Sequence, residues 1–243
     1  MRYRTAAICR RGGRRKNEDS RGYMVLDERG CWVVADGLGG YRAGEVASRL
    51  AVETIVASSR IDHEVSPGAL EKYLQEANQT LLRRQKEDPD VNGMRTTTVV
   101  LVAQGREALW AHVGDSRLYH FRQGRVRFCT IDHSVPQSLV EAGDILPESI
   151  RFHSDRHRLL RVLGKDRRVQ ASIETEKQLL EGGDALLLCT DGFWELVYEA
   201  EMEVDFVKSL TPEDWLEKME IRLFKRANGH HDNYTAVGVF VEE

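Results

Sequence analysis

Two aspartates each follow a short apolar run and precede a glycine. The first run, residues 33–35, ends in Asp36, and the second, residues 186–190, ends in Asp191. Short apolar runs bounded by turn residues predict buried strands. Because aspartate is unfavourable in strands and costly to bury alone, two such strand ends indicate a positive partner between them. Carboxylates and carbonyl oxygens prefer hard divalent cations, so the pattern predicts an Mg²⁺ or Mn²⁺ site.

Four more acids stand at predicted turns or strand ends, namely Glu18, Asp19, Asp115 and Asp232. A simple turn explains any one of these acids taken alone, but it does not explain the whole set. Carboxylates gathered at one edge repel one another and stay ionised only if cations offset their charge. Two cations about 4 Å apart would lower the pKa of a water held between them and direct it at an electrophile. Phosphorus is the natural target, so the acids favour metal-dependent phosphoryl hydrolysis.

A phosphate-binding arginine is expected beside such a site, because a guanidinium contacts two phosphate oxygens at once. Arg14 and Arg15 lie just before Glu18, in a basic loop over residues 10–16. The spacing of these side chains is explained equally well by a solvated surface loop. We therefore treat both arginines as candidates.

The hydrophobic periodicity of the sequence predicts the strands that position these residues. They are predicted over residues 2–9, 21–26, 31–35, 96–103, 108–113, 118–121, 126–130, 169–175, 184–190 and 234–241. Gly39 and Gly40 are interpreted as a tight turn that lets the next helix begin beside the metal site. A turn is also expected at Asp191.

Helices are predicted from Ala43, from Ser66 to about Pro89, and from Thr211 to about Asn228. A further helical stretch is expected after the Asp191 turn, and a polar connection over residues 58–65. Residues 132–167 are irregular and polar, and we interpret them as a flap with a short helix near its start. Because strands and helices do not alternate strictly, the pattern favours an α+β architecture with strands between helices.

The bulk composition excludes several classes of protein. The chain has 243 residues, of which 41% are hydrophobic and 30% charged, and this composition is typical of a soluble globular protein. A net charge of −4 gives no overall field that favours nucleic acid, and no apolar run approaches the roughly 18 residues of a membrane span. The four cysteines are far apart and form no CxxC pair, which indicates free thiols in a reducing cytoplasm.

The motifs form one ordered set: R-x-x-NED, V-x-D-G-x-G-G, GDSR, DHS, L-x-R-x-LG, TDG and DN. In this order they resemble the PPM family, the metal-dependent protein serine/threonine phosphatases of type 2C, and most of all its compact bacterial members. The matching positions run from Arg14 to Asn233, which is nearly the whole chain. The resemblance implies an α+β fold, a four-layer α-β-β-α sandwich of two antiparallel sheets flanked by helices. It also implies a single phosphatase domain over residues 1–243, with the flap at about residues 132–167.

The resemblance further implies a centre with two Mn²⁺ or Mg²⁺ ions per chain. In the family pattern, Asp36 bridges both metals and the Gly37 carbonyl binds one of them. Asp191 and Asp232 hold the first metal, and Asp115 matches an acid associated with a third, weaker metal in bacterial relatives. Asp36 and Asp191 are therefore expected to act in catalysis as well as in metal binding.

The other acids and the arginine follow from the same family pattern. Glu18 and Asp19 match acids that act near the metals, partly through bound water. Arg14 stands three residues before Asn17, at the position of the family's phosphate-binding arginine. A shift of one residue in the loop would place Arg15 there instead, so both remain open, with Arg14 favoured.

Two positions depart from the family pattern. Leu38 occupies the place where many eukaryotic members carry a histidine proposed as the general acid, so a metal-bound water or another group must protonate the leaving group. His153 and His157 of the flap are weaker candidates, because exposed loop histidines are usually bystanders. Glu195 stands where the family often has an aspartate at the third-metal site, which leaves third-metal binding open.

The implied reaction is direct hydrolysis of phosphoserine and phosphothreonine in proteins by a metal-bridged hydroxide, without a phosphoenzyme. Such an enzyme would oppose a cognate Ser/Thr kinase, and it is expected to be a cytoplasmic monomer without nucleic-acid or membrane partners. Two alternatives stay open. One is a phosphoprotein-binding module that keeps the fold but not turnover, and the other is a metal-dependent phosphatase for small molecules.

Overall fold

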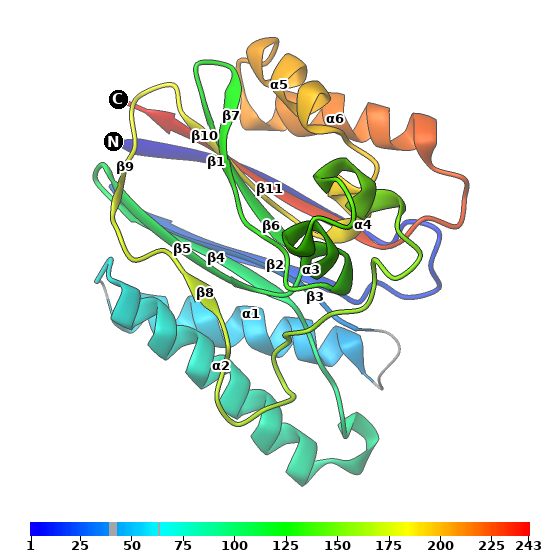
Figure 1. Cartoon of the computed structure of the whole chain (residues 1–243). Helices are drawn as coiled ribbons and strands as arrows, with labels where there is room; N and C mark the ends of the chain where they lie inside the picture. The colour runs from blue at the N-terminus through cyan, green and yellow to red at the C-terminus, as the bar shows by residue number, and fades with distance from the viewer. Residues whose placement is uncertain (39–42, 63) are drawn as a thin grey trace.

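The computed structural model describes residues 1–38, 43–62 and 64–243, so the predicted tight turn at Gly39 and Gly40 lies outside the described residues. Two antiparallel sheets pack face to face, and helices cover the outer face of each (Figure 1). Three apolar cores result, one between the sheets and one under each helical layer. The predicted α+β fold with a four-layer α-β-β-α arrangement is therefore confirmed.

The first sheet has the strand order β1-β11-β10-β6-β7, with every neighbouring pair antiparallel. Its strands are β1 (Arg2–Arg10), β11 (Tyr234–Glu242), β10 (Ala185–Cys189), β6 (Arg117–Arg122) and β7 (Arg125–Cys129). The second sheet has the order β2-β3-β4-β5-β8, and β9 also pairs with β5. Its strands are β2 (Asp19–Leu26), β3 (Arg29–Asp36), β4 (Thr98–Gln104), β5 (Glu107–Val113), β8 (Ser172–Ile173) and β9 (Gln178–Leu179).

Two long helices cover the second sheet and two cover the first (Figure 1). The pairs are α1 (Gly44–Ile61) with α2 (Pro67–Glu87), and α5 (Glu199–Val207) with α6 (Pro212–Arg226). The shorter helices are η1 (Pro89–Val91), α3 (Val135–Ala142), η2 (Pro147–Phe152) and α4 (Asp191–Trp194). Among the described residues, none of the helices combines the length and the apolar content that a membrane crossing requires.

The two apolar runs that predicted the metal site are strands β3 and β10, and both are buried on two faces. In β3, Val33 and Ala35 pack against α1 and α2, whereas Trp32 and Val34 lie between the sheets. Side chains alternate along a strand, so a strand covered on both faces has a continuous apolar sequence. By the same alternation, Asp36 falls on the side of the layer between the two sheets.

Two segments differ from the prediction. Helix α1 continues to Ile61, so the connection expected over residues 58–65 is shorter, and the Tyr73 hydroxyl donates to the Asp62 carbonyl just beyond the helix. The strand expected over residues 169–175 forms only the two-residue strand β8. Before β8, the chain is held by α2 instead of by a sheet, because the Val169 N–H donates to the Gln75 side chain.

Candidate active site

The loops at one end of the sandwich surround a cavity of about 500 Å³. It is lined by acids, by basic side chains of the N-terminal loop and by a few other residues: Arg14, Arg15, Lys16, Glu18, Asp36, Gly37, Leu38, Asp115, His157, Leu159, Asp191, Asp232 and Asn233. Every predicted site residue except Asp19 is among them. Asp19 is buried next to the cavity and lies opposite Asp36 in the pairing of β2 with β3.

Backbone hydrogen bonds fix Asp36 and Gly37 at the end of β3. The Asp36 carbonyl accepts from the Thr97 N–H at 2.9 Å and from the Thr96 hydroxyl at 2.8 Å, and the Asp36 N–H donates to the Thr97 hydroxyl at 3.0 Å. A Cβ on Gly37 would lie 2.1 Å from the carbonyl oxygen of Gly44, so only glycine lets the chain pass this close to α1. The Asp36 carboxylate is therefore carried by an anchored backbone.

Asp19 and Asp191 reach the site from different sheets. Asp19 opens β2, and its Oδ2 accepts a hydrogen bond from the Thr190 hydroxyl at 2.9 Å. Asp191 begins the short helix α4, where a turn was expected. A Cβ on Gly192 would lie 2.0 Å from the carbonyl oxygen of Asn233, so this glycine lets α4 start against the segment that leads into β11. The contact between Asp19 and Thr190 links the two sheets where the acids meet.

Several carboxyl groups of the site are buried, and some of their oxygens have no hydrogen-bond partner among the described residues. Burial raises the pKa of Asp36 and the pKa of Asp115 well above the usual value for aspartate, and the Asp191 carboxylate adds to both shifts. Burial also raises the pKa of Asp19 to about 7. Among the described residues, Asp19 Oδ1, Asp115 Oδ1 and Asp191 Oδ1 are buried and have no hydrogen-bond partner. Buried acids without donors are suited to a cluster of hard cations, so these residues fit the metals that the sequence predicts.

The two candidate arginines differ in their contacts. Arg14 Nη2 donates to Asp232 Oδ2 at 2.6 Å, so this guanidinium is tied to one of the acids. Arg15 also lines the cavity, but it makes no ion pair with another described residue. The structure therefore places Arg14 in contact with the acidic cluster, whereas Arg15 lines the cavity without an ion pair to a described acid.

The two departures from the family pattern occupy different places: Leu38 lines the cavity next to Gly37, whereas Glu195 lies near Asp191 and does not line the cavity. His157, Asp191 and Glu195 each offer a ligand atom, and these atoms lie within 4.8 Å of one another. Burial raises the pKa of Glu195 to about 7, with a further contribution from Asp191, and Glu195 pairs with Arg156 at 2.8 Å. Of the two flap histidines considered above, His157 lines the cavity and His153 does not.

Asn233 has a role that sequence reasoning did not identify. Its Oδ1 accepts from the Glu18 N–H at 2.8 Å, and its Nδ2 donates to the carbonyls of Arg11 and Lys16 at 2.7 and 2.8 Å. One side chain thus holds both ends of the basic loop beside β11. The available signal was the asparagine next to Asp232 in the DN motif, because an amide offers donors and an acceptor together.

Comparison with known proteins decides the family. A family model described as protein phosphatase 2C matches residues 9–219. The chain belongs to the protein phosphatase 2C family. The matched segment contains all the predicted site residues except Asp232.

Three relatives each match more than nine tenths of this protein phosphatase 2C member. The serine/threonine phosphatase Stp of Listeria innocua is 34% identical over 231 residues, which cover 92% of this chain and 90% of that protein. The crystal structure of serine/threonine phosphatase Stp1 from Staphylococcus aureus has a TM-score of 0.86 at 28% identity, over 100% of this chain and 96% of that chain. The catalytic domain of the serine/threonine phosphatase PstP, solved in complex with two manganese ions, has a TM-score of 0.82 at 29% identity, over 99% of both chains.

These comparisons confirm the predicted enzyme class. The protein is a metal-dependent protein serine/threonine phosphatase, and the findings do not favour a binding module without turnover. The acid-lined cavity at the end of the sandwich is its candidate active site.

A buried ion pair at the start of the flap is connected to the backbone of the phosphatase site. The Arg117 guanidinium makes two hydrogen bonds of 2.8 Å with Asp132 and lies 3.5 Å from the centre of the Trp194 ring. Trp194 Nε1 in turn donates to the Asp115 carbonyl at 2.9 Å. The series Asp132, Arg117 and Trp194 thus connects the flap to the backbone of a predicted metal ligand.

Asp132→Asn is expected to lower the free energy of unfolding by about 3 kcal/mol, because it leaves the Arg117 charge buried without its partner. The Asp132 side chain is 2% exposed, so water cannot replace the lost carboxylate. Glu107→Gln is the matched control, since it removes a surface pair with Lys177 and is expected to cost less than about 1 kcal/mol. Urea unfolding measures both variants, and equal small effects would contradict the prediction.

Proposed function

We propose that this phosphatase removes phosphate from phosphoserine and phosphothreonine of proteins at the acid-lined cavity. The observation that supports the site most is the set of buried carboxylate oxygens without partners among the described residues. In this proposal two Mn²⁺ or Mg²⁺ ions are held by Asp36, the Gly37 carbonyl, Asp191 and Asp232, with Glu18 and Asp19 beside them and Asp115 at a third, weaker site. When bound, such ions supply a Lewis acid and lower the pKa of a nearby water.

The other side chains of the cavity orient the substrate. The Arg14 guanidinium is bonded to Asp232 through one nitrogen, and its other N–H groups have no partner among the described residues, so they can donate to the substrate phosphate. His157 is the proposed proton donor to the leaving seryl or threonyl oxygen. Its Nδ1 lies 3.5 Å from the Asp191 carboxylate, which raises the pKa of His157 in the metal-free protein.

Arg14→Ala is expected to lower kcat/KM for p-nitrophenyl phosphate by about a hundredfold. A charged hydrogen bond contributes up to about 3 kcal/mol, and each 1.4 kcal/mol or so is tenfold. Arg15→Ala is the matched control from the same loop with the same change of charge, and we expect a change of less than about threefold because Arg15 contacts no described acid. Steady-state kinetics at saturating Mn²⁺ measure both variants. A larger loss in Arg15→Ala would assign the phosphate contact to Arg15.

The same proposal covers the organisation and the setting of the enzyme. Residues 1–243 would form one phosphatase domain that acts as a monomer, with the flap at about residues 132–167 facing the substrate. A cognate Ser/Thr kinase would supply the phosphorylated proteins. A reducing cytoplasm is supported by the free thiols of Cys9, Cys31, Cys129 and Cys189.

Phosphate release from a phosphothreonine peptide and from p-nitrophenyl phosphate tests the proposal, with assays in Mn²⁺, in Mg²⁺ and in EDTA. We expect release from both substrates with a divalent metal and none in EDTA. A peptide that is retained but not hydrolysed would instead indicate a binding module. Small phosphate esters that outcompete a phosphoprotein would indicate a small-molecule phosphatase, and inactivity with every divalent metal would refute the proposal.

A further inference from the structure

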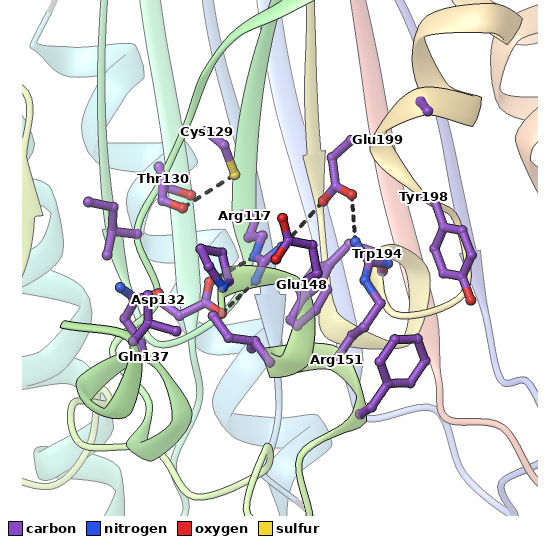
Figure 2. A pocket seen from close by; sticks show the side chains of 16 residues that line it. Arg117, Cys129, Thr130, Asp132, Gln137, Glu148, Arg151, Trp194, Tyr198 and Glu199 are labelled. Atoms are coloured by element: carbon purple, nitrogen blue, oxygen red, sulfur yellow. Dashed lines mark hydrogen bonds and ion pairs between the residues drawn. The ribbon is translucent and has the colours of Figure 1, made fainter. Parts of the chain in front are cut away.

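A second cavity, of about 650 Å³, lies between the flap and helices α4 and α5 (Figure 2). It shares no lining residue with the active-site cavity. Its volume falls within the range of roughly 300–1,000 Å³ that is typical of small-molecule sites. None of the predicted metal ligands lines it, so hydrolysis at the active site does not account for it.

The walls of this second cavity are mainly apolar and aromatic. Val140 and Phe152 of the flap line it together with Ile131, which directly precedes the flap. Trp194 and Tyr198 line it from the side of α4 and α5. Ile131 and Phe152 are 61% and 70% exposed, so the fold leaves these apolar side chains uncovered. A ligand with an apolar body would remove them from water and gain hydrophobic stabilisation.

One of the carboxylates that line the second cavity has no cationic partner among the described residues. Arg117 is neutralised by Asp132 through two hydrogen bonds of 2.8 Å, and Arg151 is neutralised by Glu199 at 2.6 Å. Glu148 is exposed and makes no ion pair with any other described residue. Figure 2 shows Glu148 among the side chains that line the cavity. An unpaired carboxylate beside aromatic walls favours a ligand that carries one positive charge.

Trp194 connects this cavity to the phosphatase site. Its ring lines the cavity, while its Nε1 donates to the Asp115 carbonyl at 2.9 Å. Its own carbonyl accepts from Arg151 Nη1 at 2.5 Å, and it ends the short helix that Asp191 begins. A ligand packed on this ring would stabilise the arrangement of Trp194 that holds the Asp115 backbone in place.

We propose that the second cavity binds a small organic cation, an aromatic or aliphatic body with one protonated amine, and that its occupancy strengthens metal binding at the active site. The apolar walls bind the body of the ligand, and Glu148 binds the ammonium group. Coupling between two sites is reciprocal, so metal bound at the acids must strengthen binding of the cation by the same factor.

Calorimetric titration of the full chain with two naphthalene probes tests the proposal. The probes are naphthalen-1-ylmethylamine, a cation, and naphthalene-1-acetate, an anion of the same aromatic body. We expect the amine to bind about tenfold more tightly than the acetate, and Glu148→Gln to remove most of this difference. We also expect the amine to bind about fivefold more tightly in Mn²⁺ than in EDTA.

Two variants, each with tryptophan in place of an alanine, test where the probe binds. Ala200→Trp fills the cavity from the exposed start of α5 and should abolish amine binding, whereas Ala57→Trp, at an exposed position on α1, should leave it unchanged. Circular dichroism verifies that both variants are folded. Equal binding of the two probes, or amine binding that survives Ala200→Trp, would overturn the binding site. Amine binding of equal strength in Mn²⁺ and in EDTA would overturn the coupling to the metals.

Discussion

Asp36→Asn is expected to lower turnover of p-nitrophenyl phosphate at saturating Mn²⁺ by at least about a thousandfold. A Lewis acid contributes several kcal/mol to such a reaction, and each 1.4 kcal/mol or so is tenfold. Asp36 would help to hold the metals, and its backbone is fixed by Thr96 and Thr97, so the neutral amide would occupy the same place without the charge. Steady-state kinetics over a range of Mn²⁺ concentrations measure the loss.

Although it lowers turnover, the same substitution is expected to make the metal-free protein more stable. In EDTA, Asp36→Asn should raise the melting temperature, because it removes a carboxyl group whose ionised form is destabilised first by burial and then by Asp191 and Asp19. Asp144→Asn, at an exposed acid of the flap, is the control for both measurements and should change neither. A variant with near-normal turnover, or one that is less stable than the parent in EDTA, would contradict the assignment of Asp36.

The stability of the metal-free protein is expected to fall as the pH rises from about 6.5 to about 8. Burial raises the pKa of Asp19 to about 7 and raises the pKa of Asp36 and Asp115 well above the usual value. The native state therefore binds more protons than the unfolded state in this range, and stability falls with rising pH at a rate set by that difference. A carboxyl whose pKa is raised by about three units loses about 4 kcal/mol of stability in all as the pH rises from about 4 to about 7, so Asp19 contributes about 1 kcal/mol of that loss above pH 6.5.

This pH range avoids opposing contributions from the buried histidines. Burial lowers the pKa of His112, and it lowers the pKa of His133 to about 3. Below the ordinary histidine pKa of about 6.5 the unfolded state therefore binds more protons at these histidines than the native state does, and stability rises with pH. Above that pH the two states bind equal numbers of protons there, so the histidines no longer contribute. Urea unfolding at several pH values in EDTA measures the slope, and the same series in Mn²⁺ is the control. Metal binding requires ionised carboxylates, so stability in Mn²⁺ should rise over the same range. A metal-free protein that becomes more stable toward pH 8 would contradict the prediction.

The layered fold and the acids of the site could be predicted because they leave local signals. A strand that is covered on both faces must have a continuous apolar sequence, and Asp36 and Asp191 interrupt two such runs just where the strands end. The order of the motifs along the chain then implied that these ends meet. The first inference depends on short stretches of sequence, and the second depends on the resemblance to a family that the ordered motifs carry from Arg14 to Asn233.

The contacts that hold the site together left no comparable signal. Asn233 bonds to backbone groups of the loop at Arg11, Lys16 and Glu18, more than 200 positions away, and any polar side chain can have the same local sequence context. The bond from Trp194 to the Asp115 carbonyl is similar, since it joins an indole to a backbone atom that every residue possesses. Long-range bonds to the backbone are independent of the partner's side chain, and sequence patterns therefore do not record them.

The pairing of β1 with β11 has a consequence for the order in which the protein becomes active during its synthesis. Asp232 and Asn233 directly precede β11, and Asn233 holds the loop that carries Arg14. A nascent chain whose residues 232–242 are still inside the ribosome lacks β11, which pairs with the edge strand β1, and it also lacks one proposed metal ligand and the side chain of Asn233 that holds the arginine loop. Strands of both sheets can pair before that point, but the proposed site is incomplete until residues 232–242 have left the ribosome and folded.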